Sequence, residues 1–235
     1  MTDLPDFVDL GLPSGILLAT SSVGASSPTE RGNIYAWGEI LPKSYYYLYY
    51  ADNSQCYRFG KTASKLNKYT LTDGLTVLDE YDDAVTMNYG PGYRLPTKEE
   101  LAQIPSNCLL VAVDGKNVKY QGSSAAGLLI YKSKGDTFRN FIDAQPDCTV
   151  TGKMSGETYS VTTDPHVFLP AAGSINKDAA SGLNTKGYYL SSTFSGTDIG
   201  KVVTFSITVS SGSYNAGYLY TRYFGSPARA VKVAP

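Results

Sequence analysis

The clearest pattern of apolar and polar positions runs through Lys201–Val209, where the two kinds of residue alternate over the second half of the segment. Alternation of this kind predicts a β-strand with one buried face. The positions expected to face the core are Val203, Phe205, Ile207 and Val209. Those expected on the outer face are Thr204, Ser206 and Thr208. Ser210–Ser213 is typical of a turn and Tyr214 begins a returning strand, so the pattern predicts a hairpin near the C-terminus.

Other short apolar runs, rich in β-branched and aromatic residues and bounded by turn-forming residues, predict further strands. They are Leu128–Tyr131, Val167–Leu169, Tyr188–Ser192, Tyr218–Tyr223 and Ala228–Val233. Helical periodicity is scarcer. Its best example is Thr97–Ile104, where Thr97 and Glu100 have the spacing of a capping box and Pro105 is expected to end the helix. A partial stripe favours a second helix over Asp79–Met87.

Two helices among many short strands predict a mixed α+β fold with an excess of loop. Lys43–Thr70 and Lys132–Val161 show no strong period, and irregular stretches of that length inside a compact domain are often functional. A chain of 235 residues is long enough to bury a core. No tandem repeat, low-complexity tail or linker divides it, so we expect a single domain over residues 1–235.

The aromatic composition points to binding. The chain has 20 Tyr against 8 Phe and 1 Trp. A buried tyrosine needs a partner for its hydroxyl, so an excess of tyrosine is typical of partly exposed rings. Such rings give contact area at low entropic cost, which is why binding loops use them. We therefore expect a tyrosine-rich contact surface.

Charge and hydropathy argue against other classes of partner. Lys and Arg number 20 against 21 Asp and Glu, with no basic stripe that could neutralise phosphates, so we expect no nucleic acid partner. No apolar run approaches the roughly 18 residues of a membrane-spanning helix, so we expect no membrane insertion. The N-terminal residues lack the basic and then apolar pattern of a signal peptide, so no export signal is visible.

The residues that could hold a metal do not have the spacing of a metal site. Cys56, Cys108 and Cys148 form no CxxC motif and have a single histidine, His166, to join them. They allow at most one disulfide, whose pair the sequence leaves open, and three buried thiols are favoured. Loop-like segments carry carboxylates that suit calcium, namely Asp136, Asp143, Asp147 and Asp164. These lack the spacing of a defined calcium loop, so we assign no metal and no cofactor.

Enzymatic chemistry is not indicated. A hydrolytic triad needs a histidine with a carboxylate and a nucleophile. His166 directly precedes the predicted strand at Val167, where a structural role is favoured. The carboxylates Asp82–Asp83 and Glu99–Glu100 are adjacent in sequence, so their side chains diverge, whereas catalysis by a carboxylate pair needs convergence. We assign no catalytic residue.

Spaced motifs along most of the chain together resemble one family. They are Val8–Gly15 (VDLGLPSG), Val23–Ala25 (VGA), Tyr35–Glu39 (YAWGE), Tyr93–Leu101 (YRLPTKEEL), Phe168–Gly173 (FLPAAG), Gly187–Thr193 (GYYLSST) and Gly225–Val231 (GSPARAV). The set resembles the "major paralogous" surface domains of gut anaerobes and their kin, the formylglycine-generating-enzyme-like branch of the C-type lectin fold. The resemblance covers the chain from about Val8 to Lys232, and its strength lies in the order of the motifs.

This resemblance implies an α+β, C-type lectin-like fold with two helices, small twisted antiparallel sheets and extensive loops. It places Gly173 and Gly225 at positive-φ or close-approach positions, and it favours ion pairs over ligand contact for Arg94 and Arg229. The related sulfatase-activating oxidases use a cysteine pair near the C-terminal part of the domain. Because no cysteine follows Cys148, that chemistry is not implied here.

The chain also departs from the family pattern. Members often carry Trp where this chain has Leu18, Tyr89, Tyr93 and Leu190, which implies a core repacked with smaller groups. Ser21 stands where members often have Cys, so a disulfide at that position is not implied.

Some members of this branch are display scaffolds, in which a diversity-generating retroelement rewrites codons for exposed residues near the 3′ end of the gene. The resemblance implies such a variable ligand-binding surface at Tyr214, Asn215, Ala216, Tyr218, Tyr220, Tyr223 and Ser226. The alternative is that these are ordinary outward residues of a tyrosine-rich hairpin. A second candidate surface is Ser44–Tyr50, whose five tyrosines cannot all point inward. Its candidate ligand residues are Tyr45, Tyr47 and Tyr49.

The residues and the resemblance together favour a non-catalytic ligand-binding or adhesion module, on a cell surface or at the tip of a phage tail fibre. Its expected partner is a cell-surface protein or glycan, and its tyrosine-rich surfaces also suit a homo-oligomer. The alternative is a structural subunit of a surface, tail or pilus assembly that uses tyrosine-rich contacts and binds no free ligand. The scaffold alone does not identify the ligand.

Overall fold

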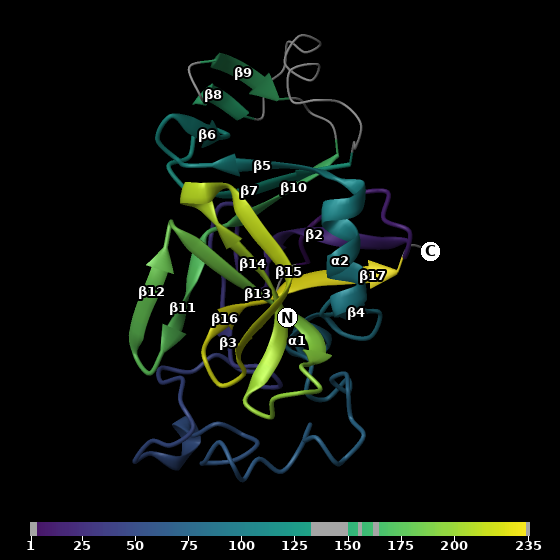
Figure 1. The fold of residues 1–235 in the computed structure, drawn as a ribbon, viewed down its shortest axis with the longest axis vertical. Helices are drawn as coiled ribbons and strands as arrows, with labels where there is room; N and C mark the ends of the chain where they lie inside the picture. The colour runs from purple at the N-terminus through teal and green to yellow at the C-terminus, as the bar shows by residue number, and fades with distance from the viewer. Residues whose placement is uncertain (1–3, 133–149, 155–156, 162–164, 234–235) are drawn as a thin grey trace.

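The computed structural model describes residues 4–132, 150–154, 157–161 and 165–233. Strands of the C-terminal half form a five-stranded sheet in the order β12-β11-β13-β14-β15 (Figure 1). Its strands are β11 (Ala172–Asn176), β12 (Ala179–Leu183), β13 (Lys186–Phe194), β14 (Lys201–Thr208) and β15 (Ser213–Thr221). Neighbouring strands run antiparallel except β11 and β13, which are parallel.

Four smaller sheets complete the described part of the chain. Their strand orders are β1-β2-β17-β4, β10-β7-β5, β6-β8-β9 and β16-β3. The strands are β1 (Phe7–Asp9), β2 (Ile16–Ser22), β3 (Ile34–Tyr35), β4 (Tyr93–Arg94), β5 (Leu109–Val113), β6 (Val118–Tyr120), β7 (Gly127–Tyr131), β8 (Val150–Met154), β9 (Glu157–Val161), β10 (His166–Pro170), β16 (Ser226–Pro227) and β17 (Arg229–Val233).

The helices are short. They are α1 (Ala84–Tyr89), α2 (Lys98–Asn107) and the 3₁₀ turns η1 (Asn53–Gln55) and η2 (Val209–Ser211). The capping box of α2 is confirmed, because the Thr97 side chain accepts from the Glu100 N–H while Glu100 accepts from the Thr97 N–H. Pro105 lies inside α2 instead of ending it, and the helix continues to Asn107.

The prediction of an α+β, C-type lectin-like fold is wrong, because strands make up 41% of the structure and helices 11%, in several small sheets. The second helix is shorter than predicted. The Asp83 side chain accepts from the N–H groups of Val85 and Thr86, so α1 begins there and not at Asp79. Further strands, such as β1, β5 and β12, form in segments that no clear alternation marks.

The predicted strands are confirmed as β7, β10, β13, β14, β15 and β17, with ends shifted by a few residues. The hairpin of β14 and β15 is confirmed as well, and Gly212 adopts the left-handed conformation at its turn. Val203, Phe205 and Ile207 are buried as expected. Val209 falls in η2 and is partly buried.

Both faces of the five-stranded sheet are covered. Leu190 and Val202 belong to a core cluster around Trp37. Tyr189 precedes Leu190 on β13 and pairs with Phe205 on β14, so both point to the opposite face of the sheet. They belong to a second cluster that also contains apolar side chains of α2. Helix α2 packs against β13, β14 and β15, and it lies beside β15 in Figure 1. Because both faces of the sheet are packed, the positions of its exposed side chains are fixed by a rigid core.

The structure settles most of the smaller expectations. Gly173 has φ +63°, and a Cβ on Gly225 would lie 2.5 Å from Ile34 Cγ2, so both glycines are required. Arg94 forms the expected ion pair with a carboxylate, that of Glu100, at 2.6 Å.

The other expected ion pair, that of Arg229, is wrong. The buried Arg229 donates to the carbonyls of Ala19 and Phe168. Cys56 is a free, buried thiol, Cys108 is buried, and Cys148 lies outside the described residues. Within the described ranges, no helix is long and apolar enough to cross a membrane.

Candidate functional site

Tyrosine rings gather on one face of the five-stranded sheet. Pairing joins Leu190 to Thr204 and Thr204 to Tyr218, and the side chains of paired residues lie on the same face. Tyr188 and Tyr220 share that face, since each lies two residues from a member of this row. The rings of Tyr188 and Tyr220 stack with centroids 4.1 Å apart and planes 11° apart. The Tyr218 ring lies 5.7 Å from that of Tyr188.

These rings explain why Thr204 is buried. Its place in the alternation predicts an outer position, yet its exposed fraction is 0%. The threonine side chain is small, so the tyrosines of β13 and β15 meet above it, and its hydroxyl donates to the Tyr218 carbonyl at 3.1 Å. Thr204 therefore points outward as predicted but into a layer of aromatic rings, and the expectation that it meets solvent is wrong.

The ring contacts continue from the sheet into the Ser44–Tyr50 segment. Phe224 meets Tyr220 edge to face at 5.9 Å, and Tyr223 meets Phe224 at 5.4 Å. Tyr47 meets Tyr223 at 5.4 Å, and Lys177 Nζ lies 5.5 Å from the centre of the Tyr47 ring. We call this connected set the aromatic strip, which comprises Tyr188, Tyr218, Tyr220, Phe224, Tyr223 and Tyr47.

Backbone hydrogen bonds hold the two parts of the aromatic strip together. The Tyr46 N–H donates to the Lys177 carbonyl at 2.7 Å, and the Lys177 N–H donates back to the Tyr46 carbonyl at 2.9 Å. Ile175 and Gly225 exchange a similar pair at 2.9 and 2.8 Å. The β11–β12 hairpin is thus fastened both to the residue before Tyr47 and to the residue after Phe224.

The strip is apolar with neutral polar tips. Burial raises the pKa of the phenols of Tyr188, Tyr220 and Tyr223 above the ordinary value of 10.0. These hydroxyls therefore stay protonated at neutral pH and can both donate and accept hydrogen bonds. The Tyr220 hydroxyl lies 2.6 Å from that of Ser174. Tyr218 is 39% exposed, so the strip is open to a ligand at that ring.

A buried arginine anchors the end of β15. Arg222 has 0% exposure and its guanidinium lies 4.9 Å from the Trp37 ring. It donates to the Tyr57 hydroxyl at 2.8 Å and to the carbonyls of Tyr69 and Lys68 at 2.9 and 3.1 Å. Because it directly precedes Tyr223, Arg222 ties the strip to the long irregular segment that contains its partners.

The structure separates the predicted C-terminal surface into parts. Tyr218, Tyr220 and Tyr223 lie on the aromatic strip. A register shift between Thr204 and Ser206 interrupts the β14–β15 ladder, and the Tyr214 ring then lies parallel to the buried Phe205 at 6.2 Å. Ala216 packs against the same core cluster as Phe205. Tyr214 and Ala216 thus lie on the other side of the sheet from the strip.

The other two members of the predicted surface do not extend the strip. Asn215 is exposed, and its side-chain oxygen accepts from the Gly217 N–H at 2.8 Å, which stabilises the irregular part of β15. Ser226 has 0% exposure in β16, so it is not accessible to a ligand in this structure.

The Ser44–Tyr50 segment is divided between core and surface. Tyr46 is 1% exposed and its hydroxyl donates to the Ile34 carbonyl at 2.6 Å. Tyr45 stacks on Tyr50 at 4.1 Å, and Tyr49 is 59% exposed. As expected, the five tyrosines do not all point inward. Of the candidates Tyr45, Tyr47 and Tyr49, Tyr47 belongs to the aromatic strip.

Sequence reasoning missed Tyr188, Phe224 and Lys177 as parts of this surface. A signal existed for Tyr188, because Tyr188 and Tyr189 are consecutive in a predicted strand and one of them must face away from the core. Tyr189 is the inward one, with its hydroxyl donating to the Pro170 carbonyl at 2.7 Å. The position of Lys177 depends on a long-range pairing that no local pattern indicates.

The carboxylates considered for catalysis have structural partners. Asp82 is ion-paired with Arg58 at 2.8 Å and Lys68 at 2.6 Å, and it accepts from the Tyr69 hydroxyl at 2.8 Å. Asp83 caps α1, and burial raises the pKa of its carboxyl.

No metal centre is found in the part of the chain that the structure describes, where no group of three or more His, Cys, Asp or Glu is placed to hold an ion. Asp136, Asp143, Asp147 and Asp164 lie outside that part. Comparison with protein-family models, with curated proteins and with solved structures returned no match.

Proposed function

We propose that the chain is a non-catalytic binding module that holds its ligand on the aromatic strip. The observation that carries the proposal is the unbroken series of ring contacts from Tyr218 to Tyr47 over a sheet packed on both faces. Rings already held by their neighbours lose little conformational freedom when a ligand binds. Tyrosines of this kind supply contact area and hydrogen-bonding tips together.

The ligand proposed for this surface is a cell-surface protein or a glycan. Both present flat apolar patches beside hydroxyl or amide groups, which suit neutral phenol rings. The module would then act in adhesion or receptor binding on a cell surface or a virion tail. Since β15 and the three residues after it carry four of the six rings, we also propose that this is the part of the chain in which ligand choice is diversified.

The test is a binding screen with a matched pair of variants. The labelled chain is applied to a glycan array and to a display library of extracellular protein domains. For the ligand found, the double variant Tyr188→Ser, Tyr218→Ser should bind at least about tenfold more weakly, as expected for aromatic anchors. Tyr49→Ser removes a more exposed ring outside the strip (59% against 39% for Tyr218) and should bind like the wild type. Equal binding by the double variant would refute the proposal.

A structural subunit is the second candidate, and a specific surface favours it. Leu41 is 70% exposed, Tyr49 59% and Tyr50 41%, so apolar side chains gather on the segment that leads into the strip. Such a surface suits contact with another subunit. Light scattering after size-exclusion chromatography distinguishes the two candidates. An oligomer that Leu41→Ser with Tyr49→Ser dissociates supports an assembly role, whereas a monomer that binds ligand supports the binding module.

A further inference from the structure

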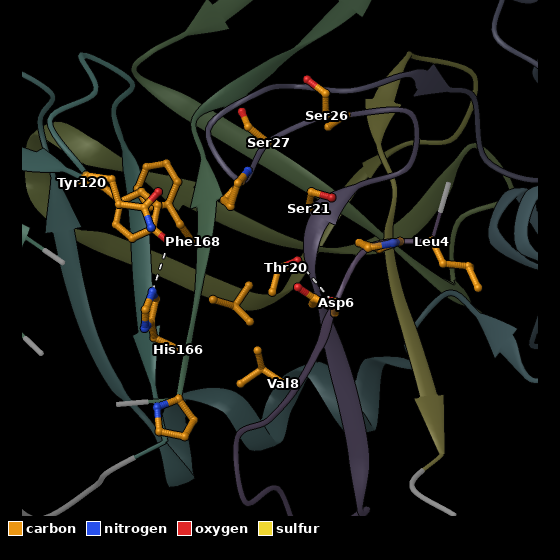
Figure 2. Close-up of a pocket in the computed structure, with 16 residues that line it drawn as sticks. Leu4, Asp6, Val8, Thr20, Ser21, Ser26, Ser27, Tyr120, His166 and Phe168 are labelled. Atoms are coloured by element: carbon orange, nitrogen blue, oxygen red, sulfur yellow. Dashed lines mark hydrogen bonds between the residues drawn. The ribbon is translucent and has the colours of Figure 1, made fainter. Parts of the chain in front are cut away.

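A groove of about 650 Å³ lies between β10 and the end of β2, and it shares no lining residue with the aromatic strip. Figure 2 shows Tyr120 and His166 on one side, with Thr20 and Asp6 on the other. The first side is formed by β6 and β10, and the second by β2 and the residues that lead into β1. The groove thus lies where separate sheets meet, which is a common place for a ligand site.

The β6–β10 side of the groove is held in place by several contacts. The Tyr120 hydroxyl lies 3.1 Å from His166 Nε2, and the Tyr120 ring stacks on Phe168 at 4.5 Å with planes 11° apart. The Phe168 carbonyl accepts from Arg229 Nη2 at 3.0 Å. Burial raises the pKa of Tyr120 to about 12, so its hydroxyl keeps its proton at neutral pH. A wall fixed in this way is preorganised for binding.

Three polar side chains of the groove form no hydrogen bond with the described residues. Ser21 is only 7% exposed, lines the groove and makes no side-chain hydrogen bond to the described residues. The carboxylate of Asp6 and the side-chain amide of Gln121 have none there either, and both residues are exposed and line the groove. Gln121 also has φ +49°, an uncommon conformation for a side-chain-bearing residue. These groups are therefore open to a ligand as hydrogen-bond donors and acceptors.

The lining selects a class of ligand. Among the described lining residues, five carry hydroxyls, namely Thr20, Ser21, Ser26, Ser27 and Tyr120. No Lys or Arg is among the described residues that line the groove, and Asp6 is the one carboxylate there, so an anion would be repelled. Val8 and Val167 add apolar surface. Donors, acceptors and apolar patches without a lysine or arginine match a neutral molecule that has many hydroxyls and C–H faces.

We propose that this groove binds a neutral sugar of one or two rings. Its volume lies within the range of about 300–1,000 Å³ that is usual for small-molecule sites. The Asp6 carboxylate accepts hydrogen bonds from sugar hydroxyls, Ser21 and Gln121 supply a donor and a donor–acceptor pair, and Val8 packs against a C–H face. This site is independent of the aromatic strip, so the chain would carry two separate binding surfaces.

The test uses saturation-transfer NMR on the full chain. The neutral probes are the methyl glycosides of glucose, galactose, mannose and N-acetylglucosamine, and the charged probes are glucose 6-phosphate and ethylamine. At least one neutral glycoside is expected to bind. Asp6→Asn and Gln121→Ala should each weaken it by about tenfold, because each removes hydrogen bonds from a partly desolvated ligand.

Two control variants isolate the groove. Asp9→Asn removes a carboxylate that is paired with Lys132 at 2.7 Å and lies outside the groove, and it should bind the glycoside like the wild type. Tyr218→Ser in the aromatic strip should do so as well, which separates this proposal from the proposed function. The proposal is overturned if no neutral glycoside binds, if only a charged probe binds, or if the Asp6 and Gln121 variants bind as tightly as the wild type.

Discussion

Arg222 is a buried cation without a carboxylate partner among the described residues. Its charge is compensated by carbonyl and hydroxyl oxygens and by five aromatic rings whose centres lie within 6.0 Å, those of Trp37, Tyr57, Phe59, Tyr69 and Phe194. Cation–π contacts of this kind are strongest where water is excluded. The residue therefore stabilises the fold while it positions the neighbouring Tyr223.

Replacing Arg222 should be strongly destabilising. Arg222→Met keeps much of the volume but leaves the carbonyls of Tyr69 and Lys68 and the hydroxyl of Tyr57 without this donor. Each buried polar group left unpaired costs about 1–3 kcal/mol, so we expect the free energy of unfolding to fall by at least about 3 kcal/mol. Urea denaturation measures this. Lys186→Met, an exposed cation on β13, should change it by less than about 0.5 kcal/mol; similar losses for both variants would contradict the anchoring role.

Some single residues were anticipated through the family resemblance, namely Gly173, Gly225 and Arg94. The partner of Arg94, Glu100, lies only six residues away in sequence. The environment of Arg222 could not be predicted, because its partners Tyr57 and Tyr69 are more than 150 residues away in sequence. The buried hydrogen bond of the Tyr46 hydroxyl to the Ile34 carbonyl could not be predicted either, because the other tyrosines of Ser44–Tyr50 suggested an exposed segment.

At the scale of elements, the β11–β12 hairpin has a stringent backbone requirement. Gly173 has φ +63°, and a Cβ there would lie 2.2 Å from the Ser181 carbonyl oxygen. Gly15 has a similar φ of +70° with no atom within 4 Å of the same position. Gly15→Ala should therefore show backbone strain alone, about 1–2 kcal/mol.

Gly173→Ala should show that strain together with a backbone clash, so its loss of unfolding free energy should be at least about 3 kcal/mol. Chemical denaturation of the two variants side by side is the measurement. If both lose the same amount, the close approach of β11 and β12 is not a constraint on the fold.

Helix α2 and strand β4 are joined by an ion pair that makes stability depend on pH. Burial raises the pKa of the Glu100 carboxyl, but hydrogen bonds from Arg94 and the Thr97 N–H outweigh it and hold the pKa below the ordinary value of 4.5. A carboxyl with a depressed pKa stabilises the folded state above its ordinary value, and that stabilisation is lost as pH falls through the folded value.

Glu100→Gln should therefore cost about 1–2 kcal/mol at neutral pH, and the difference from wild type should shrink as pH falls below the ordinary pKa of the carboxyl. Unfolding curves across the acid range test this. Glu99→Gln is the control, since that side chain is 66% exposed and should change stability by less than about 0.5 kcal/mol. A difference that stays constant with pH would exclude the ion pair as its source.

Elements with strong local signals were predictable, and the way they combine was not. The capping box fixed the start of α2, and alternation identified β14, because both signals are contained in a few residues. The order of the sheets and the pairing of β3 with β16 depend on contacts between distant segments. For this reason the sequence led to an α+β prediction, whereas the structure consists mostly of short strands in several small sheets.

At the scale of the whole molecule, the aromatic strip unites two segments that the sequence indicated separately. Tyr47 and Tyr223 are 176 positions apart, yet their rings meet, and the β11–β12 hairpin holds them together through Lys177 and Ile175. The sequence predicted tyrosine-rich contact from both segments. It could not exclude Ser226 or Ala216, whose burial follows from the irregular register of β15 and from β16.

This arrangement predicts where the gene would vary if the strip is a diversified display surface. Codons for Tyr218, Tyr220 and Tyr223 should vary across a natural population, because none of these side chains is a fully buried member of a core cluster, and Tyr223 packs only at the edge of the cluster around Trp37. Codons for Phe205 and Arg222 should be fixed, because their side chains are fully buried and large-to-small changes at such sites cost about 3–5 kcal/mol.

Sequencing the 3′ end of the gene and its flanking DNA measures this. Variation confined to the strip codons, beside a reverse transcriptase gene and a near-copy template, is the expected result. Equal variation at Tyr218 and Phe205, or none at either, would contradict diversification. In the second case a fixed ligand remains compatible with the strip, and the Tyr188 and Tyr218 variants would then decide whether it binds there.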